Sequence, residues 1–218
     1  MASMTSAQPR ATAVPDETLM AQSTVSNRFL LWIDAVGGYL VCSHDRVRIG
    51  QMAPGNAVEV PIVADLARHH ATLRRDGDSY LIEPVHAVKV NGRSIDRTTP
   101  ISDGSLLELG RGVQFRFQQP NILSSTACLQ LVSRHRTQPT TTGILLMAET
   151  CVLGPVAGSH VVCRNWSRSI VMHRLQDSLY CVVDGTFTVD GTVCQRRGLI
   201  RPGSQIVGDD FTFSVEAA

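Results

Sequence analysis

Residues 101–117 read ISDGSLLELGRGVQFRF, and this stretch holds the pattern that decides the fold. The Asp-Gly pair at 103–104 has the composition of a turn, because glycine adopts positive φ angles without steric cost. In the segment VQFRFQ (113–118) apolar and polar residues alternate, which places the valine and both phenylalanines on one face. We therefore predict a half-buried β-strand over 113–118, preceded by another over 105–109.

The same pattern of short apolar segments and turns extends from this stretch back to Phe29 and on to the end of the chain. Short apolar runs are separated by Gly, Asp, Asn or Pro at intervals of about eight to twelve residues, the spacing of an all-β sandwich. No long window places apolar residues at helical spacing without an intervening Gly or Pro. Asp76-Gly77-Asp78 favours a tight hairpin. The strands expected in the first half are 29–34, 39–42, 46–49, 58–60, 70–75, 79–83, 88–90, 105–109 and 113–118.

The composition is that of a soluble globular protein. Of the 218 residues 43% are hydrophobic and 18% are charged, and the formal net charge is +1. This balance gives no indication of binding to nucleic acid or to a membrane surface. No apolar run approaches the ~20 residues of a transmembrane helix, and none resembles a secretory signal. We expect a cytoplasmic protein whose residues 1–27, rich in Ser, Thr, Ala and Pro, form a disordered tail.

The second half of the chain repeats landmarks of the first at offsets of about 100 residues. The corresponding pairs are Tyr80 and Tyr180, Asn91-Gly92 and Asp190-Gly191, Gly104-Ser105 and Gly203-Ser204, FRF (115–117) and FTF (211–213), Ile49-Gly50 and Leu153-Gly154, and ARHHATLRR (67–75) and SRSIVMHRL (167–175). We therefore predict two β-sandwiches in tandem, at 28–121 and 122–218. The polar segment 133–143 is expected to be an enlarged loop between the first two strands of the second repeat.

The first repeat contains Ile49-Gly50-Gln51, Ala67-Arg68-His69-His70, Val90-Asn91-Gly92 and the run ISDGSLLELG (101–110). These motifs, the last of them most strongly, carry a resemblance to the forkhead-associated (FHA) family between Phe29 and Pro120. It implies a β-sandwich of the SMAD/FHA type that binds phosphothreonine peptides through the loops at one end. The tandem arrangement then consists of two FHA-like sandwiches.

Three positions that would contact the phosphate differ from the family pattern. Gln51 stands where the family has an arginine, and its neutral amide bonds roughly half as strongly. Ala67 replaces a serine that would donate its hydroxyl, and His86-Ala87-Val88 replaces an Asn-Gly-Thr loop. Loss of one charge-assisted and one hydroxyl contact removes ~2–4 kcal/mol, or ~30- to 1000-fold in affinity.

The candidate site nevertheless keeps positive charge and hydrogen-bond donors at this end. A phosphate of about −1.5 to −2 charge can use Arg68, His86 and the neighbouring Arg74 and Arg75. The residues that we assign to phosphopeptide binding are Gln51, Arg68, His69, His86 and Asn91, and those that we assign to structural support of the site are Gly50, His70 and Gly92.

The second repeat departs further from the family. Pro155 follows Gly154 and presents no cation, while Ser169-Ile170 replaces the histidine turn. No Asn-Gly-Thr equivalent precedes Asp190. We predict a degenerate sandwich that keeps the core and lacks the site.

Other functional classes find little support in the sequence. Adjacent His69 and His70 point to opposite faces of a strand, so they cannot chelate one ion together, and we expect no metal and no cofactor. The six cysteines include no CxxC pair and are expected to be buried free thiols. The chain contains no GxSxG, HExxH, GxxxxGK[ST] or GxGxxG motif, which argues against an enzyme. HHATLRR (69–75) is the basic cluster of the first repeat, and few aromatics lie near it, which argues against nucleic-acid binding.

Two hypotheses remain for the function. In the first, the chain is an adaptor that binds a protein partner, phosphorylated on threonine, at the loop end of the first repeat. In the second, it is a phosphate-independent scaffold whose exposed strand edges or inter-repeat surfaces bind the partner. The two differ in whether binding depends on phosphate and on Arg68.

Overall fold

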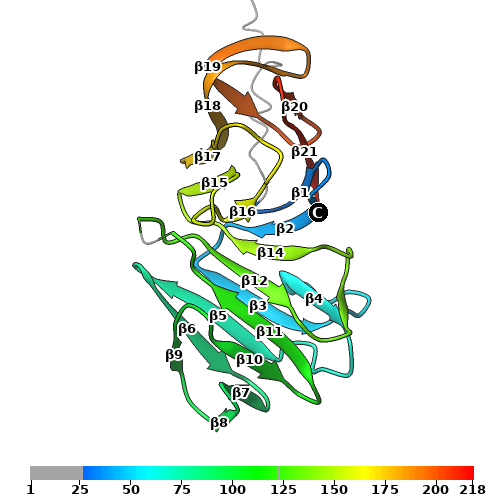
Figure 1. Cartoon of the computed structure of the whole chain (residues 1–218). Coiled ribbons are helices and arrows are strands. Elements are labelled where there is room, and N and C mark those ends of the chain that lie inside the picture. The colour runs from blue at the N-terminus through cyan, green and yellow to red at the C-terminus, as the bar shows by residue number, and fades with distance from the viewer. Residues whose placement is uncertain (1–26, 122) are drawn as a thin grey trace, which may run out of the picture.

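The computed structural model describes residues 27–121 and 123–218. The predicted tail at 1–27 therefore lies outside the described residues, apart from Asn27. Every regular element of the described chain is a β-strand, which confirms the all-β prediction (Figure 1). Because this part contains no helix, it has none that is long and apolar enough to cross a membrane.

The strands form two sheets. The smaller sheet has six strands, in the order β13 (Arg136–Thr137), β4 (Val60–Val63), β3 (Arg46–Gln51), β5 (Ala71–Asp76), β6 (Ser79–Pro84) and β9 (Thr99–Ile101). The larger sheet has fifteen, and β19 (Thr192–Ile200) pairs with β18 beside its main path. Along that path the order is β16 (Val161–Val162), β15 (Thr150–Gly154), β17 (Ile170–Leu175), β18 (Ser178–Val189), β20 (Gln205–Val207), β21 (Thr212–Ala217), β1 (Arg28–Ile33), β2 (Gly37–Cys42), β14 (Gly143–Leu146), β12 (Ala127–Leu131), β11 (Val113–Gln118), β10 (Leu106–Leu109), β7 (Val88–Val90) and β8 (Arg93–Ile95).

The smaller sheet packs against one end of the larger sheet and closes a first sandwich. Ile49 and Ile82 of the smaller sheet belong to the same fully buried cluster as Phe115 and Phe117 of β11. Arg116, between the two phenylalanines, is exposed, as the alternation predicts. The segment 113–118 therefore supplies the centre of this core.

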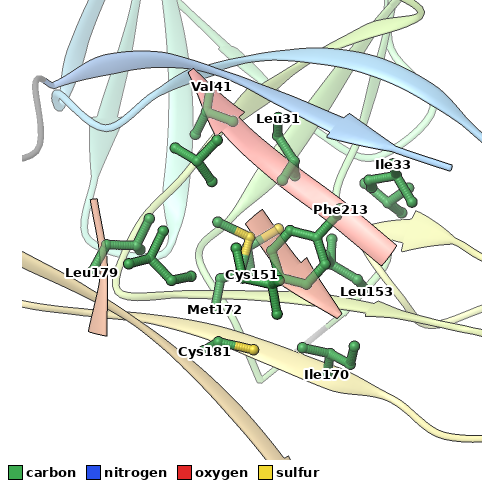
Figure 2. Close-up of a cluster of buried hydrophobic side chains, with 14 of the residues drawn as sticks. Leu31, Ile33, Val41, Cys151, Leu153, Ile170, Met172, Leu179, Cys181 and Phe213 are labelled. Atoms are coloured by element: carbon green, nitrogen blue, oxygen red, sulfur yellow. The ribbon is translucent and has the colours of Figure 1, made fainter. Parts of the chain in front are cut away.

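The rest of the larger sheet folds over on itself around a second core. The long strand β18 makes this possible, because its register with β19 shifts between Val182 and Thr186, and both β17 and β20 pair with it. Strands from the beginning and the end of the chain meet in this core (Figure 2). Side chains labelled there are Leu31, Ile33, Val41, Cys151, Leu153, Ile170, Met172, Leu179, Cys181 and Phe213.

The two cores exchange strands, so they do not follow the predicted boundary between 28–121 and 122–218. β1 pairs with β21, the last strand of the second half, whereas β12 of the second half pairs with β11, the last strand of the first. β2 and β14 lie side by side and parallel at the middle of the larger sheet (Figure 1). Each sandwich is therefore completed by the opening strands of the other half.

The four central strands, β1, β2, β14 and β12, are buried on both faces. In β1, Leu30 belongs to the first core and Leu31 to the second. In β14, Ile144 faces the first core and Leu145 the second. Since successive side chains of a strand point to opposite faces, one layer of strands serves two cores.

Corresponding hydrogen bonds occur at the predicted landmarks of the two halves. Asn91 Oδ1 and Asp190 Oδ1 each accept a hydrogen bond from the amide fifteen residues later, at 2.9 and 2.8 Å. Both residues have positive φ angles, 51° and 52°. The buried Ser105 and Ser204 hydroxyls each accept an amide hydrogen bond at 3.1 Å from three residues earlier.

Two of the predicted pairs are out of register. Tyr80 corresponds to Leu179 and not to Tyr180, because both are the buried second residue of the strand after a hairpin turn. Phe115 corresponds to Phe213, because each lies opposite the second residue of the preceding strand, β10 or β20. In both cases the sequence comparison paired residues of the same type, whereas the strand register shows which positions correspond in the two halves.

Candidate functional site

Three loops meet at the end of the first sandwich where β3 ends. They are residues 52–59 between β3 and β4, 64–70 between β4 and β5, and 85–87 between β6 and β7, and we call this the loop end. Gly50 permits the closest approach: a Cβ added there would lie 1.9 Å from the carbonyl oxygen of Arg68. A side chain at this position would therefore separate β3 from the loop that carries Arg68.

Asn56 holds two of these loops together, and sequence reasoning missed it. Its Nδ2 donates to the carbonyl oxygen of Gln51 at 2.7 Å and to that of Arg68 at 2.8 Å. The Gln51 amide in turn donates to the Ala67 carbonyl at 2.9 Å. Asparagine after Pro-Gly is a turn signal, since its carboxamide can bond to nearby backbone, and this signal could have identified Asn56.

His70 is the central brace of the loop end. Its Nδ1 accepts the Ala67 amide at 3.3 Å, and its Nε2 donates to the Ala87 carbonyl at 2.9 Å, which fixes the neutral tautomer. Its own carbonyl accepts the amides of Val85 and His86. Burial lowers the pKa of His70 below its usual value, and the nearby His86 lowers it further. The predicted supporting residue thus joins two loops while it remains uncharged.

Arg68 and His86 are the predicted site residues that the loop end presents to solvent. Both side chains are exposed, and the Arg68 guanidinium makes no hydrogen bond or ion pair with any described residue. The ring of His86 lies 5.5 Å from that of His70, centroid to centroid. The loop end therefore carries an exposed, unpaired guanidinium and an exposed imidazole whose backbone amide is bonded to the His70 carbonyl.

The remaining predicted residues are less available. His69 is partly buried, and its Nε2 lies 2.7 Å from the hydroxyl of the buried Thr72. Asn91 and Gly92 form the turn after β7, at the end of that strand away from the 85–87 loop. There the Asn91 carboxamide is bonded to the Leu106 amide, and Gly92 has a φ of 79°. The structure thus places Gln51, Arg68 and His86 at the loop end and Asn91 elsewhere.

The second sandwich has no corresponding open loop. β18 runs without interruption through the segment where the first sandwich has β6, the 85–87 loop and β7. Arg168 of the retained Ser-Arg pair is committed, because its Nη1 donates to the Asp184 carbonyl at 2.6 Å and its Nη2 lies 3.6 Å from Asp209. The Ser167 amide is bonded to Asp210. The residues that resemble a site therefore stabilise the fold.

The cysteines of the described chain are mostly buried, and its histidines belong to no metal-binding cluster. All six cysteines are free, and Cys194 is the one that is partly exposed, contrary to the expectation of six buried thiols. Burial raises the pKa of Cys42, Cys163 and Cys181 to about 12, so these thiols are protonated and unreactive at neutral pH. Within residues 27–121 and 123–218 no group of three His, Cys, Asp or Glu side chains is placed to hold a metal ion.

Comparison with known proteins gives one family match and several solved structures. Residues 47–110 match the model of the FHA domain family. EmbR of Mycobacterium tuberculosis in complex with a low-affinity phosphopeptide is 24% identical with a TM-score of 0.33, over 42% of this chain and 24% of that chain. The FHA domain of the CT664 protein from Chlamydia trachomatis is 24% identical with a TM-score of 0.29, over 38% of this chain and 89% of that one.

A further structure is the FhaA FHA domain complexed with the intracellular domain of Rv3910. It is 21% identical with a TM-score of 0.29, over 38% of this chain and 91% of that chain. The chain thus spans about a quarter of EmbR, and no curated protein matches it. The family match runs from β3 to the end of β10 and includes all three loops of the loop end, so the segment that matches the FHA domain family lies in the first sandwich.

Proposed function

We propose that the first sandwich binds a phosphothreonine peptide of a partner protein at its loop end, as an adaptor that performs no catalysis. The observation that carries the proposal is the exposed Arg68 guanidinium, which has no partner among the described residues although its backbone is fixed by Asn56. FHA domains are interaction modules, and the family match includes this loop. A cation on a fixed backbone is ready to form charge-assisted hydrogen bonds to a phosphate.

The proposed contacts differ from those of the family pattern. The backbone carbonyl and amide of Gln51 are already hydrogen-bonded to Asn56 and Ala67, so only its side-chain amide is available to a ligand. Arg68 offers a planar fork of donors, which matches phosphate oxygens in a bidentate arrangement. His86 adds ring donors beside it. One guanidinium then replaces the arginine missing at Gln51, and we expect weak binding that salt reduces.

We further propose that the second sandwich is a decayed copy of the first, in a cytoplasmic protein. The matching turn bonds of Asn91 and Asp190 and of Ser105 and Ser204 support common descent. The commitment of Arg168 to Asp184 supports a structural role for this half. In this proposal the second sandwich holds β1 and β2 and thereby the shared central layer.

The test is fluorescence-polarisation binding of the full chain to a degenerate phosphothreonine peptide library, with the unphosphorylated library in parallel. Arg68→Ala is compared with Arg93→Ala, which removes one exposed arginine from the β8 hairpin at the far end of β7. We expect binding below about 100 μM, or roughly −5.5 kcal/mol, that requires phosphate and is lost in Arg68→Ala alone. Equal binding of both libraries would favour the phosphate-independent scaffold, and equal loss in both variants would point to net charge.

A further inference from the structure

We propose that residues 132–142, the loop between β12 and β14, complete the loop end and make it select peptides with acidic residues beside the phosphothreonine. The inference rests on the proposed function, because it concerns the same end of the first sandwich. By chain order this loop belongs to the second half. The strand exchange places it on the first sandwich, where it lies beside β4 (Figure 1).

The path of the loop crosses the loop end from one sheet to the other. It begins beside the start of β11, where the Ser133 hydroxyl accepts the Gln114 amide at 3.2 Å. It then joins the edge of the smaller sheet as β13, where Arg136 lies opposite Val63. Val63 is the last residue before the 64–70 loop. The segment is therefore a direct neighbour of the loop that carries the free guanidinium.

The loop is held in place by its own hydrogen bonds. The Gln138 amide donates to the Pro61 carbonyl at 3.0 Å, and the Thr142 amide donates to the Gly38 carbonyl at 2.7 Å. The buried Thr137 hydroxyl donates to the Pro139 carbonyl at 2.7 Å. Together with the bond from the Gln114 amide to the Ser133 hydroxyl, these bonds fix both ends of the segment, so Arg134 and Arg136 stay at the loop end.

The turn between β10 and β11 approaches the same place from the other side. A Cβ added at Gly110 would lie 2.9 Å from Leu66 Cδ2 and 3.3 Å from the His70 ring, so this turn packs on the 64–70 loop. The Gly110 amide donates to the Ala87 carbonyl at 3.0 Å. Arg111, the next residue, therefore stands at the border of the loop end.

These elements place a group of unpaired positive charges at the border of the loop end. Arg111, Arg134 and Arg136, which we call the basic rim, are exposed, and their guanidinium groups make no hydrogen bond or ion pair with any described residue. Asp65 is the acidic residue of the 64–70 loop and offsets part of this charge. This excess of positive charge is a local feature of the loop end, since the whole chain has a formal net charge of only +1.

Arg68 remains the residue that binds the phosphate. Because the basic rim lies at the border of the loop end, it contacts the residues that flank the phosphothreonine in a bound peptide. Arginine pairs with a carboxylate through two parallel hydrogen bonds, whereas an apolar or neutral flank gains nothing from an exposed guanidinium. Exposed charges act over the Debye length of ~10 Å at 0.1 M salt. Acidic side chains next to the phosphothreonine therefore add affinity that the phosphate contact alone does not supply.

The experiment uses the full chain and two fluorescein-labelled phosphothreonine libraries, one with Asp and Glu flanks and one with Ala, Ser and Gln flanks. Arg134→Gln combined with Arg136→Gln tests the rim. The matched control is Arg93→Gln combined with Arg97→Gln, two exposed arginines of the β8 hairpin and the following turn. Unphosphorylated acidic peptides and Arg68→Ala complete the set, and circular dichroism verifies the fold of each variant.

We expect the rim variant to weaken acidic-flank phosphopeptides by about 3- to 30-fold at low salt and neutral-flank ones by less than about 2-fold, the range of two exposed ion pairs. The difference should shrink at 0.5 M NaCl, and the control should match the wild type. If Arg68→Ala abolishes binding while the rim variant keeps the acidic preference, the inference fails and the proposed function stands. If acidic peptides bind equally without phosphate and depend on the rim, the proposed function fails. If no library binds, both fail.

Discussion

The exchange of strands between the two cores predicts that two neighbouring leucines of β1 stabilise different cores. Leu31 is 0% exposed in the second core, and Leu30 is 7% exposed in the first. Truncation of a buried leucine to alanine removes packed methyl groups and leaves a cavity, at a cost of about 3–5 kcal/mol when the site cannot collapse. We expect Leu31→Ala to lower the stability of the second core by about that amount, although the residue belongs to the first half of the chain.

Hydrogen-exchange mass spectrometry under native conditions separates the two cores. We expect Leu31→Ala to reduce protection in β17 and β18, and Leu30→Ala to reduce it in β5 and β6. Urea unfolding followed by fluorescence adds a second readout, because Trp166 is buried in the second core with Phe211. Loss of protection in β5 and β6 on Leu31→Ala, with β17 and β18 unchanged, would refute the exchange. The same pattern for both variants would refute the separation of the cores.

Three further predictions concern the loop end and the pH dependence of the fold. Gly50→Ala should lower phosphopeptide affinity at least about tenfold and destabilise the fold by ~1–3 kcal/mol, because the new Cβ would lie 1.9 Å from the Arg68 carbonyl; peptide titration and urea unfolding measure both. Asn91→Ala should cost ~1–2 kcal/mol through its lost bond to the Leu106 amide and leave the affinity unchanged, and an effect on affinity with no change in stability would contradict its placement. Burial lowers the pKa of His160 from 6.5 to about 4, so the unfolded chain takes up a proton first as the pH falls. The free energy of unfolding should therefore drop by about 2 kcal/mol between pH 7 and pH 5 in urea titrations. The His160→Gln variant should not show this loss.

Local pattern was sufficient for the fold class and for much of the loop end. Alternation in 113–118 predicted the inward face of β11, and the predicted hairpin at 76–78 is present between β5 and β6. Gly50 lies against the Arg68 carbonyl and His70 bonds to the Ala87 carbonyl, both at the loop end. These features depend on neighbours in sequence or on one turn, so the residues themselves specify them.

Asn91 and Asn56 show where a sequence motif does not reveal the use of a side chain. Both are asparagines in turns, yet Asn91 bonds to the Leu106 amide away from the loop end, and Asn56 joins two loops within it. The difference arises from which distant strand lies beside each turn. The pattern of residues along the chain does not show which distant strand will lie beside a turn.

The sequence by itself determined that the chain is all β, that it has two sets of similar landmarks, and that the first set resembles an FHA domain. Only the tertiary structure decided that β1 completes the second core and β12 the first, and that 132–142 lies at the loop end. In FLLWI (29–33) apolar residues occupy successive positions, and both Leu30 and Leu31 are buried, on opposite faces of the strand. Backbone hydrogen bonds between strands carry no residue identity, so β1 can pair equally well with β11 or β21 until two packed cores and short connections select one.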